Sequence, residues 1–265
     1  MSSQTTTQKK LRIFRLCLVF LSLLCTCACS KTDKSDWFAF QPKNLVDPGE
    51  IGLQDWLPNE IAPVYINGSR LVQGDKAMKV WGTNVEYAET APEFNEAESR
   101  AVFFAKYGVN SVRLHKLTNP GWEGLGSLEG AAKYAPEKLD RFDYFTYQLK
   151  KQGINYGFSP IWDLMVFPSD SDSLLAYEEI ARANPEKPTK KGLVWFAEDV
   201  QDLHISAIVN LLNHKNAHSG LRYADDPALL YVEIQNEESA LFYTFIDTVK
   251  RYPSYHTLLA ERFST

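Results

Sequence analysis

Two adjacent polar residues, Asn236 and Glu237, stand at the end of a mostly apolar stretch. Residues 228–235 are rich in Leu, Val, Ile and Tyr and follow a chain breaker at 225–227, a pattern typical of a β-strand. A carboxyl group beside an amide can cleave glycosidic bonds, because the acid protonates the leaving oxygen while the amide hydrogen-bonds a neighbouring sugar hydroxyl. The alternative is a strand that ends in two solvated polar residues.

Four more side chains fall at or near the ends of predicted strands. Arg113 and His115 belong to the second predicted strand, Trp162 ends the third, and Trp122 lies in the loop between them. Either tryptophan could stack on a sugar, because the faces of pyranose rings present C–H groups to aromatic surfaces; buried packing is an equal alternative. His115 is either a residue of the cleft or a core histidine.

The elements that position these residues repeat along the chain. Residues 106–110 and 151–155 match: each is a helix end, a glycine stop and an apolar strand start. Strands separated by helices imply an α/β fold with a parallel sheet and right-handed crossovers. The apolar periodicity predicts helices over 93–107, 137–152 and 200–213, and strands over 80–84, 109–115, 154–163 and 229–235.

A hairpin and two long loops complete this organisation. Residues 64–71 predict a β-hairpin, and Asn67-Gly68 favours a type I′ turn. The loops, residues 116–136 and 164–198, follow the second and third predicted strands, and the latter includes a predicted helix over 173–183. Long loops at the C-terminal ends of parallel strands are where a barrel builds its binding cleft.

The first 29 residues are typical of an export signal. Four basic residues, ending at Arg15, precede the short apolar run 16–24. The ending at Cys29 is similar to a bacterial lipobox, which predicts lipidation of Cys29 and membrane attachment; ordinary signal-peptidase cleavage is the alternative. All four cysteines lie in this segment, so the mature domain has no disulfide and no thiolate metal site. We expect a signal at 1–29, a tether and N-terminal extension at 30–62, and a catalytic domain at 63–265.

The net charge of the mature chain limits the class of molecule that it could bind. Without residues 1–28 the chain keeps 24 Lys and Arg against 33 Asp and Glu, a net charge of −9. A domain this acidic argues against a nucleic-acid partner and is compatible with a neutral polysaccharide or oligosaccharide. The sequence indicates no cofactor, no metal and no obligate protein partner.

With these pieces in order, the sequence resembles the N-terminal half of a clan A glycoside hydrolase, most like the cellulase-type family 5. The matching segments are 80–84, 108–115 and 226–237, and the resemblance runs from about residue 63 to the end. It implies a (β/α)8 TIM barrel, here truncated after about four βα units, with an N-terminal β-hairpin.

The resemblance also implies a retaining mechanism with named roles. Glu237 would be the general acid and then the general base, with its pKa raised by burial and by a partner carboxylate. Asn236 would bind the sugar 2-hydroxyl, and Arg113 would lie beside the nucleophile; a structural ion pair is the alternative for Arg113. Glu233 has the same side parity as Glu237 along an extended strand, which makes it a second candidate carboxylate.

The nucleophile of such a barrel belongs to its seventh strand, and this sequence ends 28 residues after Glu237. We therefore expect a fragment that lacks the nucleophile half and is inactive alone, with two unpaired strand edges and an apolar barrel interior; a partner that supplies the rest is the alternative. The parent protein would be a secreted or lipid-anchored hydrolase, periplasmic, outer-membrane-anchored or extracellular, that degrades β-glycans. The alternative from another class is a non-catalytic surface lipoprotein that binds carbohydrate.

Overall fold

The computed structural model describes residues 52–161, 164–186, 188, 192–241, 245 and 249–264. The chain separates into two units, residues 1–43 and 44–265, and every described residue belongs to the second. The export signal, Cys29 and Trp162 lie outside the described residues.

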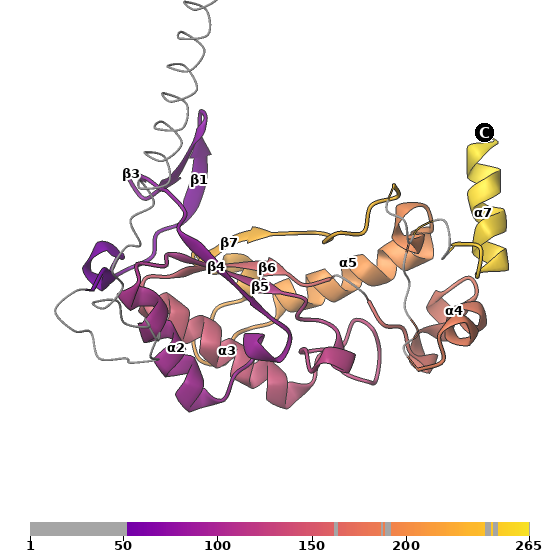
Figure 1. The fold of residues 1–265 in the computed structure, drawn as a ribbon, viewed down its shortest axis with the longest axis horizontal. Helices are drawn as coiled ribbons and strands as arrows, with labels where there is room; N and C mark the ends of the chain where they lie inside the picture. Colours follow the sequence, from indigo (N-terminus) through magenta and orange to yellow (C-terminus); the bar gives the residue numbers. More distant parts are fainter. Residues whose placement is uncertain are drawn as a thin grey trace, which may run out of the picture. The chain divides into compact units, whose positions relative to one another are not determined.

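A four-stranded parallel sheet carries the site (Figure 1). Each strand is paired with the next one along the chain, and the four carboxyl ends therefore lie at one edge. This arrangement confirms the α/β class and the parallel pairing expected from the sequence. The strands are β4 (Gly82–Glu86), β5 (Ser111–His115), β6 (Asn155–Ser159) and β7 (Leu229–Val232), in that order across the sheet.

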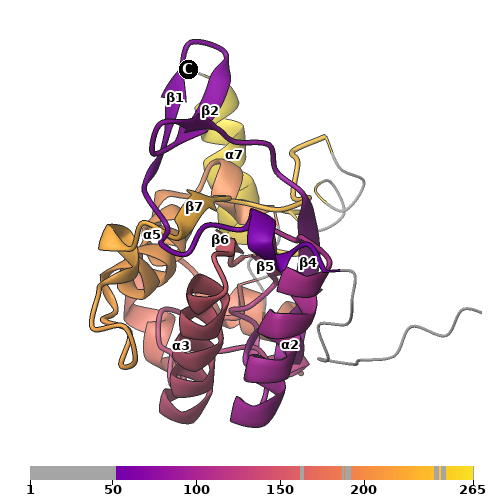
Figure 2. The ribbon, with the colours of Figure 1, turned by 90° about the vertical axis from the view of Figure 1, so that its left-hand side faces the viewer.

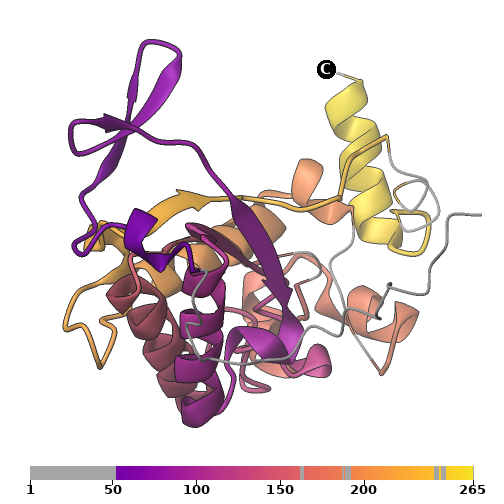
Figure 3. The same ribbon diagram turned by 60° about the vertical axis from the view of Figure 1, so that its left-hand side comes forward.

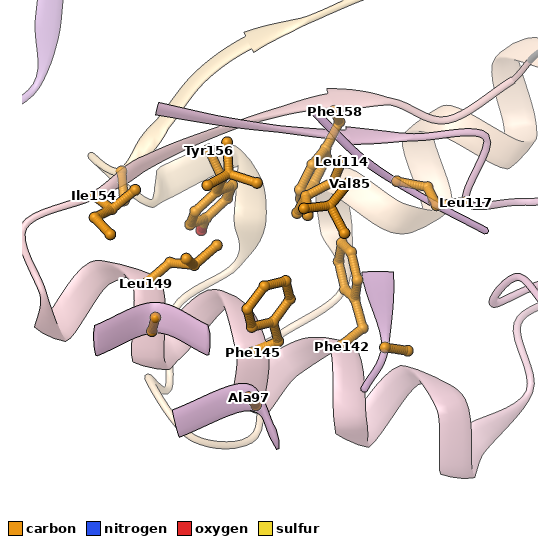
Figure 4. Packing of buried hydrophobic residues seen from close by; sticks show 14 of the residues in the cluster. Val85, Ala97, Leu114, Leu117, Phe142, Phe145, Leu149, Ile154, Tyr156 and Phe158 are labelled. Carbon is orange, nitrogen blue, oxygen red and sulfur yellow. The ribbon is translucent and has the colours of Figure 1, made fainter. Parts of the chain in front are cut away.

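Two helices, α2 (Phe94–Lys106) and α3 (Pro136–Lys151), lie side by side on one face of this sheet (Figure 2). Both end at the predicted glycines, Gly108 and Gly153, whose φ angles of +68° and +74° are in the left-handed region that favours glycine. Alternate strand residues point to these helices and form the main core with them (Figure 4). The core includes Val112, Leu114, Tyr156 and Phe158 from the strands and Phe142, Phe145 and Leu149 from α3.

The opposite face of the sheet is polar. Strand register places Asn84, Arg113 and Gly157 in one row, and Glu86, His115 and Ser159 in the next row towards the carboxyl ends. Because successive residues alternate between faces, none of these side chains belongs to the face that packs on α2 and α3. The expectation of an apolar interior is therefore wrong for the described strands.

The second half of the described chain builds a smaller core beyond the sheet. Ten residues are buried there, among them Val166, Phe196 and Tyr255, and they come from helices and from the long loop after β6. The helices are α4 (Tyr177–Ala183), α5 (Glu198–Asn213) and α7 (Pro253–Phe263). The helix predicted over 173–183 starts later because residues 168–173 form the 3-10 helix η4 (Pro168–Ser173).

The N-terminal hairpin consists of β1 (Val64–Asn67) and β2 (Arg70–Gln73), with β3 (Lys76–Ala77) beside β2. Asn67 pairs with Arg70, so Gly68 and Ser69 are the central turn residues, and of these two only Gly68 has a positive φ. A type II′ turn needs glycine at the first central position, so the expected type I′ turn is wrong. Gln73 Nε2 donates to Asn155 Oδ1 on β6 at 3.0 Å and joins the hairpin to the sheet.

The described part of the expected extension packs on the main core and on α2. Ile61 is buried in the main core, and the backbone N–H of Leu53 donates to the carbonyl of Lys106 at the end of α2. The 3-10 helix η1 (Gln54–Trp56) lies in this segment. Across the described ranges, no helix is long and apolar enough to span a bilayer.

Candidate active site

Arg113 is the centre of the polar face. It lies in the middle of β5, between neighbouring strands that supply its hydrogen-bond acceptors. Its Nε and Nη2 donate to Glu233 Oε2 at 3.1 and 2.6 Å. Its Nη1 donates to Asn84 Oδ1 at 3.0 Å. Its Nη2 also donates to Ser159 Oγ at 3.0 Å and Asn236 Oδ1 at 2.7 Å. Arg113 on β5 therefore joins β4, β6 and the segment that follows β7 at one point.

Asn236 is buried, and both ends of its amide are in defined surroundings. Its backbone N–H donates to the carbonyl of Ile161 and its Oδ1 accepts from Arg113. Its Nδ2 is buried and has no hydrogen-bond partner within the described part of the chain. A buried donor without an acceptor is costly, so this amide nitrogen is well suited to a ligand oxygen. The role of Asn236 as a sugar-binding residue stays a prediction.

Glu233 is the carboxylate beside Arg113. Burial raises the pKa of Glu233, but hydrogen bonds from Ser159 and Arg113 and the positive charge of Arg113 outweigh burial, so the net pKa is lowered. The side chains of Arg113 and Glu233 keep 29% and 32% of their surface exposed, which makes this a partly buried ion pair. Among the described residues, the carboxylate next to Arg113 is thus Glu233, the arrangement of the structural ion pair considered from the sequence.

His115 is buried at the end of β5, and its Nδ1 lies 2.8 Å from Ser159 Oγ. Burial and then the positive charges of Arg113 and Lys116 lower the pKa of His115 to about 4. The imidazole is therefore neutral at pH 7. Through Ser159 it joins the Arg113 network, so the structure places it as a buried partner of that network.

Glu237 differs from what the resemblance implies for it. The residue is exposed, so the expected burial is absent, and its φ of +51° is in the left-handed region. Such a backbone is uncommon for a residue with a side chain, and it occurs often at functional sites. The negative charge of Glu237 contributes to the raised pKa of Lys116, so the two side chains are close enough to interact.

Glu233 lies on the polar face of the sheet, as its parity along the strand predicts, but the alternation does not continue to Asn236. Strand β7 ends at Val232, and both Glu233 and Asn236, which have opposite parity, reach Arg113. The regular alternation of an extended strand therefore stops before residue 236. The backbone N–H of Glu233 donates to the carbonyl of Phe158 and continues the pairing of β7 with β6, so Glu233 lies on the Arg113 face.

Trp122 lies in the 3-10 helix η3 (Pro120–Trp122), half-buried in the loop after β5. Its ring meets that of Tyr87 edge to face, with centroids 5.2 Å apart. Tyr87 directly follows β4, in the 3-10 helix η2 (Tyr87–Thr90), and Figure 3 shows the chain turning there before α2 begins. Neither Tyr87 nor Ser159 was identified from the sequence. Both lie at the carboxyl ends of strands, so correctly placed strand ends would have identified them.

In the described ranges, no group of three or more His, Cys, Asp or Glu side chains is arranged to hold a metal ion. Asp170, which the sequence places in an acidic run, accepts the backbone N–H groups of Phe167 and Ala131. Its role is to fix the loop after β6.

No family model and no curated protein matches this sequence. Among solved structures, a glycoside hydrolase family 5 mannosidase from Rhizomucor miehei is 14% identical, with a TM-score of 0.50 over 72% of this chain and 54% of that one. The chain shares its fold with part of a family 5 barrel. This likeness confirms the fold resemblance expected from the sequence, including a partial TIM barrel.

Two endo-mannanases are similar as well. One from Rhizomucor miehei is 20% identical, with a TM-score of 0.46 over 66% of this chain and 48% of that chain. One from Thermotoga petrophila is 16% identical, with a TM-score of 0.44 over 67% of this chain and 39% of that chain. The chain spans about half the length of the solved structures that it matches.

Proposed function

We propose that this chain supplies the acid/base side of a retaining glycoside hydrolase that acts on a β-glycan. One observation carries the proposal: the buried Nδ2 of Asn236 lacks an acceptor among the described residues, while its Oδ1 is held by Arg113. That orientation leaves a donor for a sugar hydroxyl directly beside Glu237. The family 5 fold, whose solved examples include a mannosidase, makes β-mannan the first substrate to test.

The chemistry assigned to the chain is proton transfer. In a retaining reaction Glu237 gives its proton to the leaving glycosidic oxygen, and a second carboxylate about 5–5.5 Å away attacks the anomeric carbon. Glu237 then takes a proton from the water that releases the sugar. By resemblance, the attacking carboxylate belongs to the seventh strand of a complete barrel, so this chain contributes the acid/base and the 2-hydroxyl contact.

The proposal includes export. A basic segment, a short apolar run and a cysteine in a lipobox-like context support secretion with lipidation at Cys29. Mass spectrometry of the N-terminus of the protein isolated from its source distinguishes a lipidated Cys29 from ordinary signal-peptidase cleavage.

Replacement of Glu237 by Gln tests the acid. Reducing-sugar release from β-1,4-mannan is measured for the 265-residue chain and for the protein as its source produces it, each with and without the substitution. We expect negligible hydrolysis by the chain alone, and a loss of roughly 10²–10⁴-fold from the source protein on Glu237→Gln. Glu137→Gln, at an exposed position on α3, is the matched control. Undiminished hydrolysis by Glu237→Gln would reject the assignment.

A non-catalytic carbohydrate-binding protein is the second candidate. The Arg113–Glu233 ion pair favours it, because Arg113 already has a carboxylate partner within the chain. Titration of the isolated chain with neutral oligosaccharides separates the two functions. Tight, saturable binding by a soluble monomer, with no hydrolysis by the source protein, supports this candidate.

A further inference from the structure

Four residues other than glycine have a positive φ in the described ranges, and all four belong to the carboxyl-end loops of the sheet or to residues close to them. Tyr87 (+56°) directly follows β4, and Lys116 (+55°) directly follows β5. Glu123 (+59°) follows Trp122, and Glu237 (+51°) follows Asn236. Side chains are disfavoured in this conformation, and such residues cluster at functional sites. The distribution singles out this rim of the sheet.

Three side chains of the rim form a connected wall: Tyr87, Lys116 and Trp122. Lys116 Nζ donates to the Tyr87 hydroxyl at 3.1 Å and lies 5.2 Å from the centre of the Tyr87 ring. The Tyr87 and Trp122 rings meet at an interplanar angle of 75°, so they form a corner of two aromatic surfaces. Tyr87 contacts both the ammonium of Lys116 and the indole of Trp122 and so connects the wall.

The charge of the wall is balanced. Lys116 Nζ is 3.7 Å from Glu86 Oε2, and only 16% of the Lys116 side chain is exposed. Burial lowers the pKa of Lys116, but the hydrogen bond with Tyr87 and the negative charges of Glu86 and Glu237 outweigh burial and raise it. The ammonium is therefore charged and already neutralised. A neutral ligand fits such a surface better than an acidic one, in agreement with the acidic mature chain.

We propose that the Tyr87–Lys116–Trp122 wall is a sugar-binding subsite for a neutral hexopyranose, in which Trp122 stacks on the sugar and Tyr87 and Lys116 are positioning residues. The inference rests on the proposed function and deepens it, because it adds a glycan contact at the loops that follow β4 and β5. Pyranose faces carry C–H groups that pack on aromatic rings, and an edge-to-face pair holds the indole in one orientation.

Binding measurements on the 265-residue chain test the wall without requiring hydrolysis. Mannohexaose is titrated by calorimetry and by tryptophan fluorescence, and hexagalacturonic acid is the acidic comparison. We expect the wild-type chain to bind the neutral probe more tightly. Trp122→Ala and Tyr87→Ala should each weaken binding about tenfold, and Trp122→Ala should also remove the fluorescence change. Tyr87→Phe keeps the ring contact and should bind within a few-fold of wild type.

Trp81 is the matched control. It is an exposed tryptophan, 66% accessible, just before β4 and so at the opposite end of that strand. Trp81→Ala should leave mannohexaose binding unchanged, and thermal unfolding of every variant checks that the loss is not a folding defect. Equal losses in Trp81→Ala and Trp122→Ala, or preferential binding of hexagalacturonic acid, would overturn the inference.

Failure of the wall and failure of the proposed function give different results. If Asn236→Ala abolishes mannohexaose binding while Trp122→Ala and Tyr87→Ala do not change it, the wall is not a sugar-binding subsite. The proposed site at Asn236 then stands. If the folded wild-type chain binds neither mannohexaose, cellohexaose nor xylohexaose, both proposals are rejected.

Discussion

Replacement of Glu233 by Gln tests whether the Arg113 network stabilises the fold as well as shaping the site. The substitution preserves the size of the side chain and removes its charge. It leaves Arg113, whose side chain is 29% exposed, without the carboxylate that accepts two of its N–H groups. The remaining acceptors of Arg113 are uncharged, so the guanidinium becomes a partly buried and unpaired cation.

The size of the effect follows from this partial burial. Exposed ion pairs contribute about 0.2–1 kcal/mol, whereas removal of one partner from a buried pair costs about 3–5 kcal/mol. Because both side chains are about a third exposed, solvent screening brings the expected loss down to about 1–2 kcal/mol at pH 7. The folded-state pKa of Glu233 is lowered, so its contribution is present above the unfolded-state pKa and is lost as the pH falls through the folded-state pKa.

Urea denaturation at pH 7 and at progressively lower pH measures this difference. We expect Glu233→Gln to be less stable than wild type at pH 7, and the gap to narrow below about pH 4. Glu89→Gln is the matched control, because Glu89 pairs with Arg100 but is 64% exposed; its effect should stay within about 0.5 kcal/mol. A Glu233→Gln loss no larger than that of Glu89→Gln, or a gap that widens in acid, refutes the reasoning.

Two further predictions concern the same face. His115 should titrate with an NMR midpoint near pH 4, and a midpoint near 6.5 would contradict the burial argument. Because folding lowers the pKa of His115, its effect on stability should become unfavourable as the pH falls from about 6.5. Gly157→Ala should cost about 1–3 kcal/mol in urea denaturation, because a Cβ there would overlap the Tyr231 ring. Adding Tyr231→Ala should recover most of that loss, and no recovery would place the strain elsewhere.

The helices could be predicted from the sequence because their signals are local. Apolar spacing and a terminal glycine set the bounds of α2 and α3 to within one residue of the expected ranges. The order of the four strands followed from the same repeat. In contrast, the hairpin turn was misjudged because Asn-Gly usually fills both central positions, whereas here the register makes Asn67 a strand residue.

The candidate site was harder to predict because its contacts join distant parts of the sequence. Arg113 and Glu233 are 120 residues apart, and no local pattern predicts their ion pair. Asn236 was found because an amide beside a carboxyl group is visible in the sequence. Its fixed orientation, with Oδ1 on Arg113 and Nδ2 unpaired within the described chain, depends on the sheet.

The observed strand β4 is shifted by two residues from the predicted strand, which explains why Tyr87 was not identified from the sequence. The apolar pair Val80-Trp81 suggested a strand over 80–84, which would place Asn84 at the rim of the sheet. The observed strand is β4, so Asn84 lies one row inside, against Arg113, and Tyr87 is the first residue beyond the sheet. Val80 and Trp81 are exposed and precede β4, whose residues Thr83 and Asn84 are polar, so apolar character does not mark this strand.

The polar face also changes what the sheet needs in order to be stable. An apolar half-barrel would expose hydrophobic surface to water, whereas this face is held by one cation and its acceptors, which water can solvate. The main core lies on the other face, with α2 and α3. The main core and the candidate site therefore lie on opposite faces of the sheet, so substitution of Trp122 can weaken ligand binding while leaving the main core intact. Substitutions within the Arg113 network, in contrast, change stability as well as the site, because Arg113 joins segments from different strands.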